Sequence, residues 1–254
     1  MNDNTEKNKY IGYIRDSIHE TIFMLKMNIY TIVFFSIFAI IYMPLAINNI
    51  FEADYYANTP NYIKLGIIIP IIITYNILFS LLISIIVASA IEQERAQHIL
   101  EYLYVYSRYN INGFLAIKLL SSLLMGITIT IPYILLVYTV INMHINIRIN
   151  EVITIFLSIL ISVVSFTYIM LIIVLVLRPK YTSTVKFSLI ILVYLAISLL
   201  ARKIESPESL AKLNVTLTEI VLPTYIVSAV ILIISIIVYH IMKDRIVELS
   251  LREG

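Results

Sequence analysis

Long runs of apolar residues, separated by short polar connections, restrict the fold of this chain more than any other feature. A helix that crosses the hydrocarbon core of a bilayer needs about 20 predominantly apolar residues. Six runs come close to or exceed that length, namely Ile29 to Ile47, Leu65 to Ile91, Phe114 to Ile141, Val152 to Leu177, Val185 to Ala201 and Pro223 to Met242. The sequence therefore predicts an all-α integral membrane protein with six transmembrane helices, of which the fifth is the shortest.

Composition agrees with a membrane protein and excludes several kinds of chemistry. Hydrophobic residues make up 60% of the 254 positions and charged residues 13%, whereas soluble domains carry about 25% charged residues. The net charge of +2, without a run of like charges, argues against a nucleic-acid partner. Because the chain has no cysteine, it has no disulfide, no thiolate metal site and no thiol nucleophile.

Lysine and arginine are distributed unequally between the two predicted sides of the membrane. Five of the 18 lie on one side, at Lys64, Arg148, Arg202, Lys203 and Lys212, and the other 13 lie on the opposite side. Cytoplasmic connections carry the excess of positive residues. We therefore expect a multi-pass protein of the cell membrane with both termini, and the connection between the second and third spans, in the cytoplasm.

Two segments outside the spans have helical patterns of their own. Before the first span, apolar residues recur at spacings of three and four, at Ile11, Ile14, Ile18, Ile22 and Leu25. This pattern predicts an amphipathic helix on the membrane surface, within a cytosolic segment 1–28; the alternative is a cytosolic helix that packs on a partner. The polar segment 202–222 has Ser206, Pro207 and Glu208 in the order that begins a helix, which predicts a short helix outside the membrane. The six-span domain would cover 29–242, and a cytosolic tail 243–254.

The interiors of the six predicted spans contain no Asp, Glu, Arg or Lys, since Lys118 and Lys186 lie near the starts of the third and fifth ranges. Proton- or ion-coupled transporters and intramembrane proteases usually need such residues within the membrane. The four histidines are scattered over four segments without the spacing of metal ligands, at His19, His98, His144 and His240. We therefore predict no catalytic residue and no metal site, and the sequence identifies no substrate-binding residue.

Hydroxyl and amide side chains do occur inside the predicted spans. Ser80 and Ser84 share one helix face, Ser158, Ser162 and Ser165 share another, and Asn76 is the strongly polar side chain deepest in a span. Such groups can bind a ligand, but more often they bond neighbouring helices or their own backbone. We predict the structural role.

The connection between the second and third spans is a polar segment with helical character. Glu92 with Arg95, and Glu94 with His98, have the spacings that let side chains meet on a helix. An apolar stripe follows, and Asn110 or Asn112 is placed to cap the third span. The segment 92–112 is therefore predicted to be an amphipathic cytosolic helix; alone, it could equally be a solvated connector.

These residues resemble a motif of the permease subunits of exporter-type ABC transporters, which move polysaccharides, lipids, drugs or peptides. That motif reads E-R-E-x-G-T-L-E-x-L-L, followed by a proline-containing turn and then G-K at the start of the third span. The matching positions are Glu94, Arg95, Leu100, Glu101, Leu103 and Lys118. The departures include His98 and Ile117 in place of glycine, Ile99 in place of threonine and Ser107 in place of proline. The six spans, the amphipathic N-terminal helix and the polar outer segment are also similar to that class.

The resemblance implies that segment 92–112 is the coupling helix that docks on a separate ATPase subunit. The contact residues it implies are Glu92, Glu94, Arg95, Gln97, His98, Glu101 and Arg108. The chain has no G-x-x-x-x-G-K-[ST] phosphate loop, and its five glycines are too scattered to form one, so ATP and Mg would be bound by the partner ATPase and this chain would not be an enzyme. Further expected partners are a second permease chain, identical or related, and membrane lipids.

Two other functions remain open from the sequence. A six-span membrane scaffold or assembly factor without transport activity would have the same spans and no ATPase partner. A lipid-modifying enzyme would need clustered acids or histidines at the interface, and only Glu92, Glu94 and Glu101 cluster.

Overall fold

The computed structural model describes residues 3–37, 61–96, 111–144, 148–177, 181–188, 191 and 217–252. Within these residues the chain is helical and contains no strand. The helices are α1 (Asp3–Met27), α2 (Ile29–Ile37), α5 (Asn61–Ala96), α7 (Ile111–His144), α8 (Ile149–Val176) and α11 (Leu217–Arg252). A further short helix covers 181–188. The all-α prediction is confirmed for the described residues.

Among the residues that the structure describes, four helices are long and apolar enough to cross a membrane. The qualifying stretches are Asn76–Arg95 in α5, Ile111–Leu135 in α7, Ile149–Val176 in α8 and Thr224–Ile246 in α11. They correspond to the second, third, fourth and sixth predicted spans. Of the first predicted span, the structure describes α2 alone, and of the fifth only 185–188 and 191, so the remaining parts lie outside the described residues.

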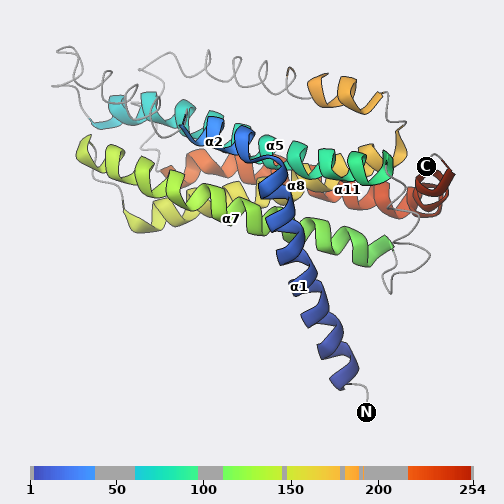
Figure 1. Cartoon of the computed structure of the whole chain (residues 1–254). Helices are drawn as coiled ribbons and strands as arrows, with labels where there is room; N and C mark the ends of the chain where they lie inside the picture. Colours follow the sequence, from blue (N-terminus) through green and yellow to red (C-terminus); the bar gives the residue numbers. More distant parts are fainter. Residues whose placement is uncertain are drawn as a thin grey trace.

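Helix α8 is the centre of the bundle, and α5, α7 and α11 all pack against it (Figure 1). Its buried face is formed by apolar residues together with hydroxyls. At the contact with α7, a Cβ added to Gly126 would lie 3.4 Å from Leu160 Cδ2, an ordinary van der Waals distance. Around the other contacts, packing relies on large interdigitating side chains such as Ile83, Ile159 and Met170, which are fully buried or nearly so.

Buried polar side chains join α5, α8 and α11, as the sequence predicted for a structural role. Asn76 Nδ2 donates to Ser158 Oγ at 2.5 Å, and Ser84 Oγ lies 3.1 Å from Thr167 Oγ1. Ser162 Oγ lies 2.8 Å from Ser228 Oγ of α11. Several of these hydroxyls also donate to carbonyls of their own helix, because a backbone oxygen four residues earlier is the nearest acceptor.

The helices extend beyond the apolar runs that predicted them. Helix α11 already begins at Leu217 and continues to Arg252, so 217–222 of the predicted outer segment and most of the predicted tail belong to one 36-residue helix. Helix α7 begins at Ile111, which places Asn112 inside the helix and not at its cap. Asn110, the other candidate cap, lies outside the described residues. The physical reason is that hydropathy marks only the stretch suited to hydrocarbon, whereas a helix continues into its polar flanks. The predicted helix start at Ser206 lies outside the described residues.

Candidate functional site: an ionic cluster at one end of the bundle

The last turn of α5 carries three charged side chains that bind other helices. Helix α7 runs opposite to α5, α8 and α11, so the end of α5 lies beside the start of α7, the end of α8 and the end of α11 (Figure 1). The charged side chains gathered there form what we call the ionic cluster, which consists of Glu20, Glu92, Glu94, Arg95, Lys118 and Lys186.

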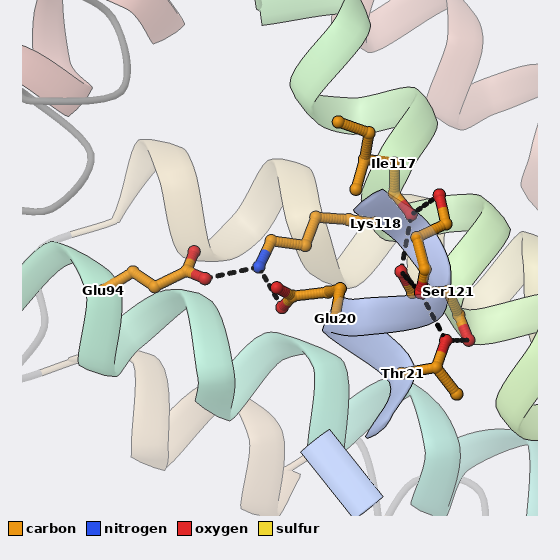
Figure 2. Close-up of polar contacts among 7 residues, drawn as sticks. Glu20, Thr21, Glu94, Ile117, Lys118 and Ser121 are labelled. Carbon is orange, nitrogen blue, oxygen red and sulfur yellow. Dashed lines mark hydrogen bonds and ion pairs between the residues drawn. The ribbon is translucent and has the colours of Figure 1, made fainter. Parts of the chain in front are cut away.

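Lys118 of α7 is bound by carboxylates from two different helices (Figure 2). Its Nζ lies 2.5 Å from Glu94 Oε1 of α5, and it also pairs with Glu20 Oε1 of α1. The ring of Phe114, one turn earlier in α7, lies 5.4 Å from the same ammonium, in the range of a cation–π contact. The Lys118 side chain is only 3% exposed, so its charge depends on these partners for stabilisation.

Helix α1 is also joined to α7 by reciprocal hydrogen bonds (Figure 2). Thr21 Oγ1 donates to Ser121 O at 3.3 Å, and Ser121 Oγ donates to Ser17 O at 3.1 Å. Small side chains at these positions let the two backbones approach closely. These bonds bring Glu20 to Lys118.

Arg95 is bound to the C-terminal end of α8. Its Nη1 donates to Val174 O at 2.9 Å and to Leu177 O at 2.7 Å, and the residue is 2% exposed. The last carbonyls of a helix have no partner within the helix and carry partial negative charge. A buried guanidinium at this position supplies both the missing hydrogen-bond donors and a positive charge. In this way a side chain of α5 fixes the end of α8.

Glu92 binds the helix that follows α8. Lys186 Nζ of helix 181–188 pairs with Glu92 Oε2 and donates to Ser89 Oγ at 3.1 Å. Glu92 and Ser89 lie one turn apart on α5, so both hold the same ammonium. Together with Arg95, this contact places both sides of the α8 to 181–188 connection against α5.

The charges of the ionic cluster balance, since Glu20, Glu92 and Glu94 oppose Arg95, Lys118 and Lys186. The second oxygens of two carboxylates, Glu92 Oε1 and Glu94 Oε2, are buried without a hydrogen-bond partner. Removing one member of a buried pair leaves an uncompensated charge, which costs several kcal/mol. The arrangement is therefore suited to joining helices mechanically.

The structure describes three of the seven residues implied as ATPase contacts. Glu92, Glu94 and Arg95 lie together at the end of α5, and their side chains are engaged within the chain. Gln97, His98, Glu101 and Arg108 lie outside the described residues. Sequence reasoning missed Glu20 and Lys186 as members of the cluster. In the sequence, Lys186 could have been noticed as a lone charge at the start of an apolar run. Nothing marked Glu20 except that it lies off the line of apolar residues at Ile11, Ile14, Ile18 and Ile22.

Comparison of the chain with protein-family models, curated proteins and solved structures finds no match. Among the residues that the structure describes, no group of three or more histidine, aspartate or glutamate residues could hold a metal ion.

Proposed function

We propose that this chain is the permease subunit of an ATP-driven exporter, forms half of a substrate path with a second permease chain, and is driven by separate ATPase subunits. The observation that carries the proposal is the ionic cluster. Glu94 and Arg95 join the last turn of α5 to α1, α7 and α8 immediately before the polar connection 97–110. A displacement applied to that connection would reach all of these helices, which is what coupling requires.

This proposal divides the implied contact residues into two groups. Glu92, Glu94 and Arg95 transmit movement from inside the chain, and Gln97, His98, Glu101 and Arg108 in the connection contact the ATPase. Both termini and the connection lie in the cytoplasm, and ATP and Mg are bound by the partner. Helix α1 lies on the membrane surface, with its exposed isoleucines toward lipid.

The test is copurification of the tagged chain from its native membrane, followed by measurement of ATP hydrolysis in the eluate. The variant Arg108→Glu reverses a charge in the connection, and Arg148→Glu, an exposed site just before α8, is the matched control. We expect about tenfold less ATPase with Arg108→Glu, equivalent to about 1.4 kcal/mol of docking energy, and no change with the control.

The alternative, a membrane scaffold without transport activity, makes a different prediction for the same experiment. If the unmodified chain brings down no ATPase at a stoichiometric level, the exporter proposal is wrong and the scaffold is favoured. Equal recovery of ATPase by both variants would instead reject Arg108 as a contact.

A further inference from the structure

Side chains around the axis of α1 fall into three sectors. Ser17, Thr21 and Met24 are buried and form the side that packs on the bundle. The isoleucine stripe, which consists of Ile11, Ile14, Ile18 and Ile22, is between 44% and 55% exposed. At 3.6 residues per turn, the stripe lies about 100° around the helix from the packed side. The exposed cations Arg15 and Lys26, with His19, lie beyond the stripe.

This arrangement matches a helix that lies in the membrane plane beside a bundle. Such a helix turns one side to the bundle, and the side at a right angle to it meets the hydrocarbon. In Figure 1, α1 runs steeply across the long helices of the bundle. After Asn28 the chain continues directly into α2, whose nine residues IYTIVFFSI are without charge, so the stripe is continuous with an apolar segment.

Two carboxylates on a single ammonium link the position of α1 to that of α5. Glu20 lies between Ser17 and Thr21 in sequence and borders the packed side, so any shift of α1 over α7 moves Glu20 relative to Lys118. The same ammonium binds Glu94 of α5. The position of Lys118 Nζ, and with it the last turn of α5, therefore depends on where α1 lies.

We infer that α1 senses the bilayer surface, which binds the isoleucine stripe, and sets the position of the last turn of α5 through Glu20 and Lys118. Lipid packing around α1 then regulates the same site that the proposed function uses for coupling. The inference rests on the proposed function only where it says that lipid packing regulates coupling. Its tests use the purified chain in lipid without any ATPase. A failed ATPase copurification therefore leaves this inference standing, and failure of these tests leaves the proposed ATPase partnership standing.

The first test locates the stripe. The chain has no tryptophan, so a single introduced tryptophan is an unambiguous probe. We expect brominated phospholipids in proteoliposomes to quench the fluorescence of Ile18→Trp at least twofold more strongly than that of its neighbour His19→Trp, the matched control on the cation side. Equal quenching at the two positions would overturn the surface placement of the stripe.

The second test measures the link to α5. The absence of cysteine allows spin labels at Gln93→Cys and Ala116→Cys, two exposed positions on α5 and α7 outside the ionic cluster. In nanodiscs we expect Glu20→Gln to shift the distance distribution between the labels. Changing the acyl-chain length of the lipid should shift it in the chain with Glu20 intact and not in Glu20→Gln. The inference is rejected if the distance distribution does not change with acyl-chain length, or if it changes equally with Glu20 intact and in Glu20→Gln. This measurement requires no substitution in the isoleucine stripe.

Discussion

Lys118 Nζ and Glu94 Oε1 lie 2.5 Å apart, although the residues are 24 positions apart in the sequence and belong to different long helices. Their bond, shared with Glu20, connects α5 to α7 at the end of the bundle where the polar connection begins. The pair is almost entirely removed from solvent. Removing one of these charges should therefore destabilise the fold strongly, whereas replacing all three charged side chains together should destabilise it much less.

Replacement of Lys118 by methionine should destabilise the chain by about 3–5 kcal/mol, because Glu20 and Glu94 are left facing each other without a cation. The measurement is thermal unfolding in detergent, followed by loss of the monodisperse peak. Lys118→Arg keeps the positive charge, so its loss of unfolding free energy should be much smaller. The triple variant Lys118→Met with Glu20→Gln and Glu94→Gln should recover a large part of the loss; if it is no more stable than Lys118→Met, the electrostatic explanation fails.

Replacement of Arg95 by methionine should weaken the end of α8. Hydrogen bonds to charged groups contribute about 1.5–3 kcal/mol each, and Arg95 makes two to the carbonyls of Val174 and Leu177. We expect faster amide hydrogen exchange in the last turn of α8 and a lower midpoint of unfolding. Arg148→Met, an exposed arginine at the opposite end of α8, is the matched control and should change stability by less than about 0.5 kcal/mol.

The pair of Glu92 and Lys186 can be tested by exchange of charges. Either Glu92→Lys or Lys186→Glu alone places two like charges together and should destabilise the chain, whereas the double exchange restores an ion pair. We expect a coupling energy of about 1–3 kcal/mol from the double-mutant cycle of unfolding free energies. Additive effects of the two substitutions would mean that helix 181–188 is held by other contacts.

Asn76→Leu should change the unfolding free energy by less than about 2 kcal/mol. It removes the bond to Ser158, and interhelical hydrogen bonds within membranes average only about 0.6 kcal/mol. The substitution also removes Asn76 Oδ1, a buried oxygen without a partner, which offsets part of the loss. A much larger cost would indicate that Asn76 organises more of the α5 and α8 contact than this bond.

The sequence predicted the helical class and the four described helices that are long and apolar enough to cross a membrane, because apolar runs of bilayer length leave few alternatives. It also predicted that Asn76, Ser80 and Ser158 bond neighbouring helices, since lone hydroxyls and amides in a span have few other partners. The predicted ends of the helices were less accurate. Helices such as α11 continue into polar flanks that hydropathy does not mark, and Asn112 proved to be inside α7, where its Oδ1 accepts a bond from Tyr239 Oη.

The ionic cluster was beyond the reach of sequence patterns for a different reason. Spacing rules connect residues three or four positions apart, and they suggested the pairs Glu92 with Arg95 and Glu94 with His98. His98 lies outside the described residues, so its pairing with Glu94 stays a prediction. The structure describes bonds that these rules do not reach, which join Glu94 to Lys118, and Lys118 to Glu20 at a separation of 98 positions. Such contacts depend on which helices become neighbours, and local spacing rules do not reveal that.

The attachment of Arg95 to the end of α8 also imposes an order in time. Val174 is synthesised 79 residues after Arg95, an interval of about 4–16 seconds at ribosomal rates of 5–20 residues per second. Glu20, Glu94 and Lys118 are all made before then, so the residues of the ion pairs among α1, α5 and α7 are present before the carbonyls that Arg95 binds exist. Helix 181–188 follows α8 and carries Lys186, the partner of Glu92, so its arrival is the step of biogenesis that completes the buried charge balance. A chain interrupted before Lys186 would present an incompletely assembled helical bundle to quality control.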